Sequence, residues 1–137
     1  MSKKHVQLSW QNDTVPVSNK FEDSYYSLEN GLHEANYVFI DGNSLQNRLS
    51  HGFQIAELGF GTGLNFLATC AAWNKASKTG KFNFVSFEGY PISNSDLRKA
   101  HLLFPEVSEY AEILQTRWDE IIEGNLVDFG FASLKIF

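Results

Sequence analysis

The fold is decided by the stretch Ile55-Ala56-Glu57-Leu58-Gly59-Phe60-Gly61-Thr62-Gly63-Leu64-Asn65-Phe66-Leu67. An apolar strand runs into three alternating glycines, and an apolar helix begins directly after them. Glycine has no Cβ, so it turns sharply and lets a ligand approach the backbone closely. The N–H groups at the start of the new helix then face that ligand. The pattern predicts a nucleotide-type cofactor loop at the end of a first strand.

The composition indicates an ordinary globular domain. The chain has 137 residues, enough for one modest domain, and a formal net charge of −5 with scattered basic residues. Such a charge disfavours strong unassisted binding to nucleic acid, which needs a basic face. A single cysteine, Cys70, rules out an internal disulfide and fits a reducing compartment. The chain shows neither a membrane span of about 18 apolar residues nor the apolar region of a signal peptide, so we expect no membrane association and a cytoplasmic protein.

The first 50 residues differ in pattern from the rest. Val6, Leu8 and Trp10 alternate as in a strand, and residues 15–17 suit an edge strand. Residues 32–40 fit either a helix or a hairpin strand, and we favour the helix. We therefore expect residues 1–50 to form an N-terminal extension of short strands and a helix, separate from residues 51–137.

From residue 53 onward, strands and helices alternate. The predicted strands cover residues 53–58 and 82–87, and residues 126–137 are expected to be β-structure, a third parallel strand. The predicted helices cover residues 64–73, 94–103 and 107–114, the second of them capped by Ser93. This order predicts an α/β fold with a parallel sheet. About three parallel strands precede Phe137, so the sequence is expected to be the first half of a Rossmann-like domain.

The glycine spacing distinguishes between two cofactors. In the dinucleotide fingerprint the third glycine falls three residues after the second, where this chain has Leu64. The pattern E-x-G-x-G-x-G instead matches motif I of S-adenosylmethionine (SAM) methyltransferases, in which a carboxylate suits the positive sulphonium. The candidate cofactor-binding residues are Glu57, Gly59, Phe60, Gly61, Thr62, Gly63 and Glu88. A glycine-rich turn without a ligand is the alternative.

Glu88 is a candidate for binding the ribose. It follows the second predicted strand, where an acid can accept hydrogen bonds from two ribose hydroxyls. A solvated loop glutamate is the alternative. Because the carboxyl ends of adjacent parallel strands meet at one edge of the sheet, we expect Glu88 to lie beside the glycine loop.

Further segments resemble those of one family. They are Phe21-Glu22-Asp23-Ser24-Tyr25-Tyr26-Ser27, Asn30-Gly31-Leu32-His33-Glu34, Tyr37-Val38-Phe39-Ile40 with Gly42-Asn43, and Ser86-Phe87-Glu88 with Tyr90-Pro91. Together with the glycine loop they resemble the methyltransferase domain of the MnmC family, bacterial enzymes that modify the wobble uridine of tRNA. The resemblance covers about residues 10–118.

This resemblance implies a SAM-dependent enzyme that converts 5-aminomethyluridine to 5-methylaminomethyluridine in tRNA. In many bacteria an oxidase domain that uses FAD is fused to it, so FAD applies only if that domain belongs to the parent protein. Tyr25 and Tyr26 are candidates for contact with the substrate base, with core packing as the alternative. The family's expected catalytic Asp, in a D-G-F-x-P segment, would lie beyond Phe137. We therefore expect an incomplete and inactive fragment with no catalytic residue assigned; Gly89 also replaces a frequent family lysine.

Two other functional hypotheses stay open. One is a non-catalytic module whose sheet is completed by a second copy or by a C-terminal partner chain. The other, disfavoured by Leu64, is an oxidoreductase that uses NAD or FAD. The four histidines, at positions 5, 33, 51 and 101, show no metal-ligand spacing with one another or with Cys70, so no metal is expected.

Overall fold

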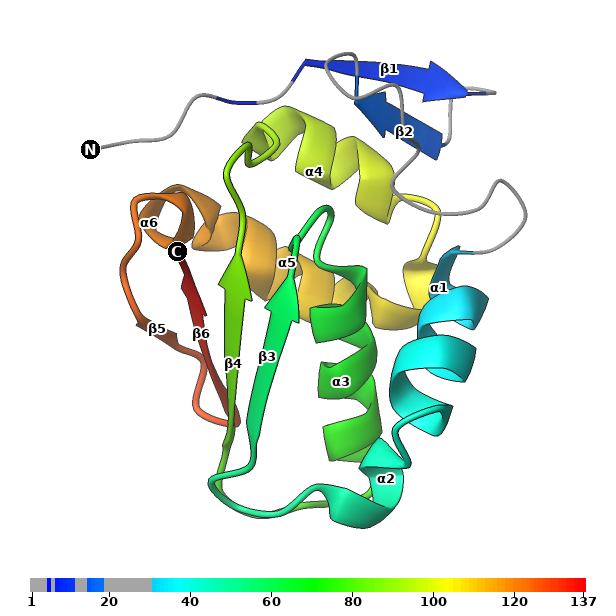
Figure 1. The fold of residues 1–137 in the computed structure, drawn as a ribbon, viewed down its shortest axis with the longest axis vertical. Helices are drawn as coiled ribbons and strands as arrows, with labels where there is room; N and C mark the ends of the chain where they lie inside the picture. Colours follow the sequence, from blue (N-terminus) through cyan, green and yellow to red (C-terminus); the bar gives the residue numbers. More distant parts are fainter. Residues whose placement is uncertain (1–4, 6, 12–14, 19–30) are drawn as a thin grey trace.

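The computed structural model of the chain describes residues 5, 7–11, 15–18 and 31–137. Its elements are drawn in Figure 1. In the described residues, β1 (Leu8–Gln11) and β2 (Val15–Ser18) form an antiparallel pair, and four more strands form a second sheet in the order β3-β4-β6-β5. Val6 of the predicted first strand lies outside the described residues.

The larger sheet confirms the predicted α/β fold. Its strands β3 (Gln54–Leu58), β4 (Phe82–Phe87) and β6 (Ala132–Ile136) run parallel, with Ile55 opposite Phe84 and Phe84 opposite Leu134. The strands predicted for residues 53–58 and 82–87 are confirmed to within one residue. Helices connect β3 to β4 and β4 to β6, as parallel strands require.

The C-terminal segment differs in detail from its prediction. The third parallel strand is confirmed in β6, but β5 (Val127–Asp128) runs antiparallel to β6. The reversal occurs at Gly130, whose φ is 91° and whose N–H donates to Asp128 Oδ1 at 2.7 Å. Asp and Gly together favour such a turn, because the side chain bonds the backbone two residues on and glycine tolerates positive φ.

The other elements of the described chain are helical. They are α1 (Gly31–Glu34), the π-helical η1 (Ala35–Asp41), α2 (Leu45–Arg48), α3 (Leu64–Lys75), α4 (Asn94–His101), the 3₁₀ turn η2 (Pro105–Val107), α5 (Ser108–Thr116) and α6 (Trp118–Ile122). The helix favoured for residues 32–40 is confirmed. The predicted cap of α4 is also confirmed, since Ser93 Oγ accepts from the Asp96 N–H at 3.2 Å.

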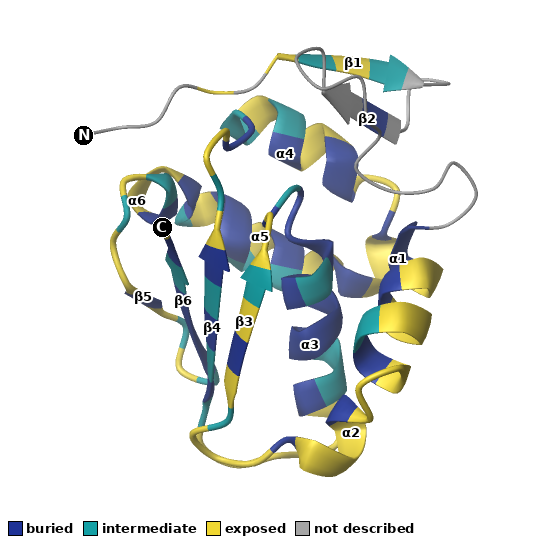
Figure 2. Ribbon diagram, viewed as in Figure 1, coloured by how far each residue is buried: buried dark blue, intermediate teal, exposed yellow. Residues whose placement is uncertain are grey.

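The core lies between the sheet and the helices. Phe66 of α3 packs edge to face on Phe84 of β4, with ring centroids 5.3 Å apart, and both rings are buried. Figures 1 and 2 show α3 beside β3, with the helical segment 31–41 outside it. Leu32 and Ile40 of that segment belong to the same core cluster. A domain boundary at residue 50 stays a prediction.

The opposite face of the sheet carries exposed apolar side chains. Leu58 at the end of β3 is 88% exposed, Phe87 48% and Phe137 50%. The rings of Phe87 and Phe137 stack at 5.3 Å. Figure 2 shows the exposed ends of β3 and β4 in yellow. A parallel sheet normally has both faces covered, so this face is suited to further packing.

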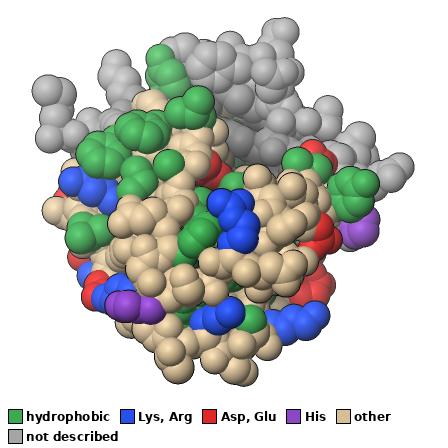
Figure 3. Space-filling model, turned by 60° about the horizontal axis from the view of Figure 1, so that its bottom comes forward, with side chains coloured by type: hydrophobic (Ala, Val, Ile, Leu, Met, Phe, Trp, Pro, Cys, Tyr) green, Lys and Arg blue, Asp and Glu red, His purple; other side chains and the backbone are tan. Residues whose placement is uncertain are grey.

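Two features of the molecule bear on binding to nucleic acid and to membranes. Figure 3 shows one face of the molecule, on which Lys and Arg side chains are spread among neutral ones while hydrophobic side chains gather at one side. Within the described residues, no helix is both long and apolar enough to span a bilayer.

Candidate functional site

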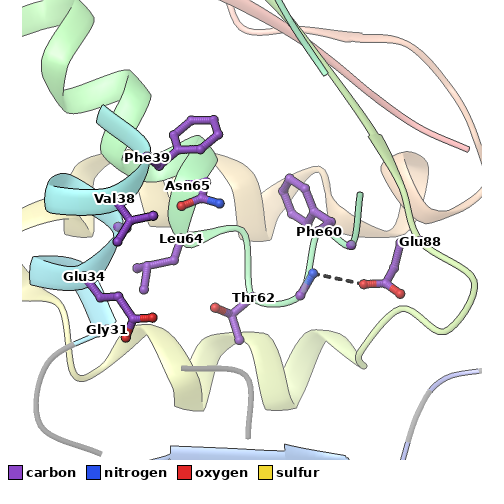
Figure 4. A pocket seen from close by; sticks show the side chains of 12 residues that line it. Gly31, Glu34, Val38, Phe39, Phe60, Thr62, Leu64, Asn65 and Glu88 are labelled. Atoms are coloured by element: carbon purple, nitrogen blue, oxygen red, sulfur yellow. Dashed lines mark hydrogen bonds between the residues drawn. The ribbon is translucent and has the colours of Figure 1, made fainter. Parts of the chain in front are cut away.

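A cavity of about 320 Å³ opens at the carboxyl end of β3. Figure 4 shows it between the glycine loop, the start of α3 and the helical segment 31–41. Its lining residues are Gly31, Glu34, Ala35, Val38, Phe39, Gly59, Phe60, Gly61, Thr62, Leu64, Asn65 and Glu88. Four predicted loop residues, 59–62, therefore meet Glu88 at one cavity, as expected from the parallel strand order.

The loop conformation requires glycine at its end. Gly63 has a φ of 80°, and a Cβ added there would lie 2.7 Å from Phe60 Cε1 and 3.1 Å from Leu114 Cδ2. Phe60 in turn stacks on Trp118 with ring centroids 5.6 Å apart. The third glycine therefore permits a close approach of the loop to α5, while Gly63 itself is not among the cavity-lining residues.

Glu88 connects the ends of the two strands. Its Oε1 accepts the Gly61 N–H at 3.0 Å, the bond dashed in Figure 4, and its Oε2 accepts the Tyr90 N–H at 3.3 Å. A carboxylate oxygen has more than one lone pair, so these bonds leave acceptor capacity. Glu88 is thus held in place by the loop that it faces.

Glu57 lies behind the loop and does not line the cavity. Its carboxylate accepts from Asn65 Nδ2 at 3.1 Å and from Ser86 Oγ at 3.3 Å. Burial raises the pKa of Glu57 from 4.5 to about 7, the two donors oppose the shift, and the Glu88 charge adds to it. Asn65, which lines the cavity, links Glu57 to it.

Thr62 is tied to the helices by its backbone. Its carbonyl accepts a hydrogen bond from His101 Nε2 at 2.7 Å, and Gln115 Nε2 lies 2.8 Å from His101 Nδ1. The Thr62 hydroxyl is buried, and its Oγ1 has no hydrogen-bond partner among the described residues. A buried hydroxyl beside a cavity can bond a ligand without displacing another partner.

Comparison with known proteins identifies relatives of this chain. The chain is 43% identical over 134 residues to the tRNA 5-methylaminomethyl-2-thiouridine biosynthesis bifunctional protein MnmC of Leptospira borgpetersenii, which aligns with 94% of the chain. The same-named protein of Aeromonas hydrophila is 44% identical over 131 residues and aligns with 90% of the chain. That of Vibrio cholerae is 43% identical over 149 residues and aligns with 99%.

The chain is homologous to a segment of MnmC. It spans about one fifth of the curated relatives that it matches, 20% of the Leptospira protein and 22% of the Vibrio protein. No profile of a protein family matches it. The crystal structure of MnmC2 from Aquifex aeolicus matches with a TM-score of 0.69 at 17% identity, over 98% of this chain and 43% of that one. This likeness confirms the predicted Rossmann-like α/β fold class.

The other predicted site residues of this MnmC homologue lie partly outside the described structure. Tyr25 and Tyr26 fall within residues 19–30, which are not described, so their contact with substrate stays a prediction. No group of three or more His, Cys, Asp and Glu side chains within the described residues is placed to hold a metal ion. Cys70 is buried on α3, and burial raises the pKa of its thiol.

Sequence reasoning missed several residues of the site. Asn65 was within the quoted glycine stretch, and Glu34 ended a quoted family segment, yet neither was assigned a role. His101 was considered only as a metal ligand. No local sequence pattern indicates the hydrogen bond between His101 and Thr62, because 39 positions separate the two residues.

Proposed function

We propose that this chain forms the SAM-binding part of a methyltransferase that modifies tRNA. By relation to MnmC, the acceptor would be the amine of 5-aminomethyluridine at the wobble position, and the product would be 5-methylaminomethyluridine. The methyl transfer would take place in the cytoplasm. FAD would take part only if an oxidase domain belongs to the parent protein.

The observation that carries the proposal is the bond between Glu88 and the Gly61 N–H. It places a carboxylate from the end of β4 against a glycine loop from the end of β3, at one cavity. Rossmann-type sites for adenosine cofactors use this pair of features, because the loop accommodates close backbone approach and the acid accepts from the ribose hydroxyls. The orphan hydroxyl of Thr62 adds a polar group for the same ligand.

The residues present fit SAM. When bound, SAM supplies a methyl group activated by a positive sulphonium. Glu88 would hold the ribose, the loop backbone would face the ligand, and Glu57 would favour a cation near the loop by its charge. Burial raises the Glu57 pKa to about 7, so a nearby cation would promote its ionisation.

Calorimetry with S-adenosylhomocysteine and, separately, with NAD tests the cofactor assignment. We expect heat of binding with S-adenosylhomocysteine and weaker or absent binding with NAD. Tighter binding of NAD would overturn the methyltransferase assignment and favour an oxidoreductase.

Replacing Glu88 by Ala is expected to weaken S-adenosylhomocysteine binding by about 1–3 kcal/mol, the cost of lost charge-assisted hydrogen bonds. Glu88→Gln should lose less, because its amide oxygen can still accept from Gly61. The exposed Glu123→Ala, at the end of α6, is the matched control. Isothermal calorimetry on folded variants measures the change, and equal affinity of Glu88→Ala and the parent would remove Glu88 from the site.

A self-association surface is a second candidate function. Leu58, Phe87 and Phe137 expose apolar area on one sheet face, and within the described residues no strand pairs with the outer edge of β3. Open edges and apolar patches favour pairing with another chain. A second copy of this chain is the simplest occupant.

Leu58→Asp is expected to shift the chain from dimer or larger species to monomer, because it places a charge on that apolar surface beside the open edge of β3. Sedimentation velocity over a range of concentrations measures this shift. Leu102→Asp, which alters an 81% exposed leucine at the end of α4, is the control. A parent chain that stays monomeric at every concentration would contradict the second candidate.

A further inference from the structure

The glycine loop is held from outside the cavity by two buried side chains. His101 of α4 is 4% exposed and Gln115 of α5 is 8% exposed. His101 Nε2 bonds the Thr62 carbonyl at 2.7 Å, and His101 Nδ1 bonds Gln115 Nε2 at 2.8 Å. The site assigned to the cofactor uses neither residue directly.

The chemistry of the amide fixes the protonation state of the ring. An amide nitrogen can only donate, so Gln115 Nε2–H donates and Nδ1 of His101 must accept. The ring proton is therefore on Nε2, where it donates to the Thr62 carbonyl. Burial lowers the pKa of His101, which favours the neutral ring that this arrangement needs.

Gln115 is itself held in one orientation. Its Oε1 accepts from Arg98 Nη1 at 3.4 Å, and its backbone carbonyl accepts from Asn94 Nδ2 at 3.0 Å. Arg98 and Asn94 both belong to α4, so the network joins α4, α5 and the loop. A flipped Gln115 amide would point its NH₂ group at Arg98, which also only donates.

The network fixes one peptide plane of the loop from both sides. The Thr62 carbonyl and the Gly63 N–H belong to the same peptide unit, which is planar. The carbonyl is bonded by His101, and the N–H donates to the Phe60 carbonyl at 2.9 Å. Rotation of this unit would break both bonds and would move the Thr62 side chain, whose hydroxyl lies at the cavity in Figure 4.

We propose that His101, oriented by Gln115, is a positioning residue that holds the Thr62–Gly63 peptide in the conformation that binds the cofactor. The identity of the ligand rests on the proposed function, whereas the hydrogen-bond network does not. His101 acts through the loop and does not touch the ligand. Its loss should therefore loosen the loop before any ligand is added.

The experiment compares the parent chain with His101→Leu and His101→Gln. Leucine removes the donor, whereas glutamine carries an N–H at a similar reach and should restore it. NMR on the ligand-free protein reads the His101 tautomer and the amide hydrogen exchange of Gly61 and Gly63. Calorimetry with S-adenosylhomocysteine reads the affinity. His51→Leu is the matched control, because His51 Nδ1 also bonds backbone, at Lys81, near the opposite end of the strands.

We expect the Nε2–H tautomer in the parent chain. For His101→Leu we expect about tenfold faster exchange at Gly63 and about tenfold weaker binding, since a buried carbonyl loses its partner. His101→Gln should restore both, and His51→Leu should leave both unchanged. Should His101→Leu fail to fold, Gln115→Met frees the tautomer while keeping the side-chain length, and it should speed Gly63 exchange.

Two results would overturn the inference. One is an Nδ1–H tautomer in the parent chain. The other is parent-like exchange and affinity in folded His101→Leu, or in Gln115→Met if the leucine variant does not fold. If the parent chain binds no S-adenosylhomocysteine while the tautomer and exchange results hold, the proposed function fails and the positioning role stands.

Discussion

Glu57→Gln is expected to stabilise the protein by about 3 kcal/mol at pH 8 and by less than about 1 kcal/mol at pH 5. Burial raises the pKa of Glu57 from its ordinary 4.5 to about 7, so the folded state holds a proton that the unfolded state has lost. The stabilising contribution of Glu57 is therefore complete below pH 4.5 and is lost as pH rises through 7. Glutamine stays neutral and does not lose it. Urea denaturation of both proteins at the two pH values measures the difference.

The matched control is Glu123→Gln, because Glu123 is exposed at the end of α6. Its denaturation curves should match those of the parent at both pH values. Parallel pH dependence in Glu57→Gln and the parent would show that Glu57 does not titrate as described. Under the proposed function, the same variant should lose more affinity for SAM than for S-adenosylhomocysteine, because only SAM carries the sulphonium charge that Glu57 favours.

Gly63→Ala is expected to destabilise the protein by about 3 kcal/mol, from left-handed backbone strain and overpacking together. The added Cβ would meet Phe60 Cζ at 2.8 Å and Leu114 Cδ2 at 3.1 Å, at a φ of +80°. Phe60 has little room to retreat, because it stacks on Trp118. Urea denaturation measures the loss in free energy of unfolding.

Gly59→Ala separates the two causes. Gly59 has nearly the same φ, +81°, but its added Cβ would meet no atom within 4 Å. Gly59→Ala should lower the free energy of unfolding only by the backbone strain, about 1–2 kcal/mol. Equal losses in the two variants would mean that the Phe60 ring moves aside and that packing does not require Gly63.

Much of the fold was predictable because its signals are local. Alternation of apolar residues located β4, and the spacing of Ser93 and Asp96 located the start of α4. Positive φ at glycines 59, 61 and 63 follows from the one residue type that adopts it freely. The C-terminal hairpin was harder, because β5 has only two residues and leaves almost no periodic pattern.

The site divides in the same way. Glu88 was predictable beside the loop, because parallel strands bring their carboxyl ends together and a motif marks each end. Glu57 belonged to the same motif, yet it lies outside the cavity and bonds Ser86, 29 positions away. The same applies to its raised pKa, since burial is a property of the packed chain and not of the motif.

The sequence by itself determined the order of strands and helices from residue 53 onward, the glycine loop, the acid at the end of β4 and the relation to MnmC. Each of these depends on residues close together in the chain or on matched motifs. Only the tertiary structure decided that His101 and Gln115 hold Thr62, that Gly63 touches Phe60 and Leu114, and that one sheet face is exposed. These contacts join α4, α5 and the loop. Side chains distant in sequence meet only once the helices have packed on the sheet, and no local pattern encodes the distance between them.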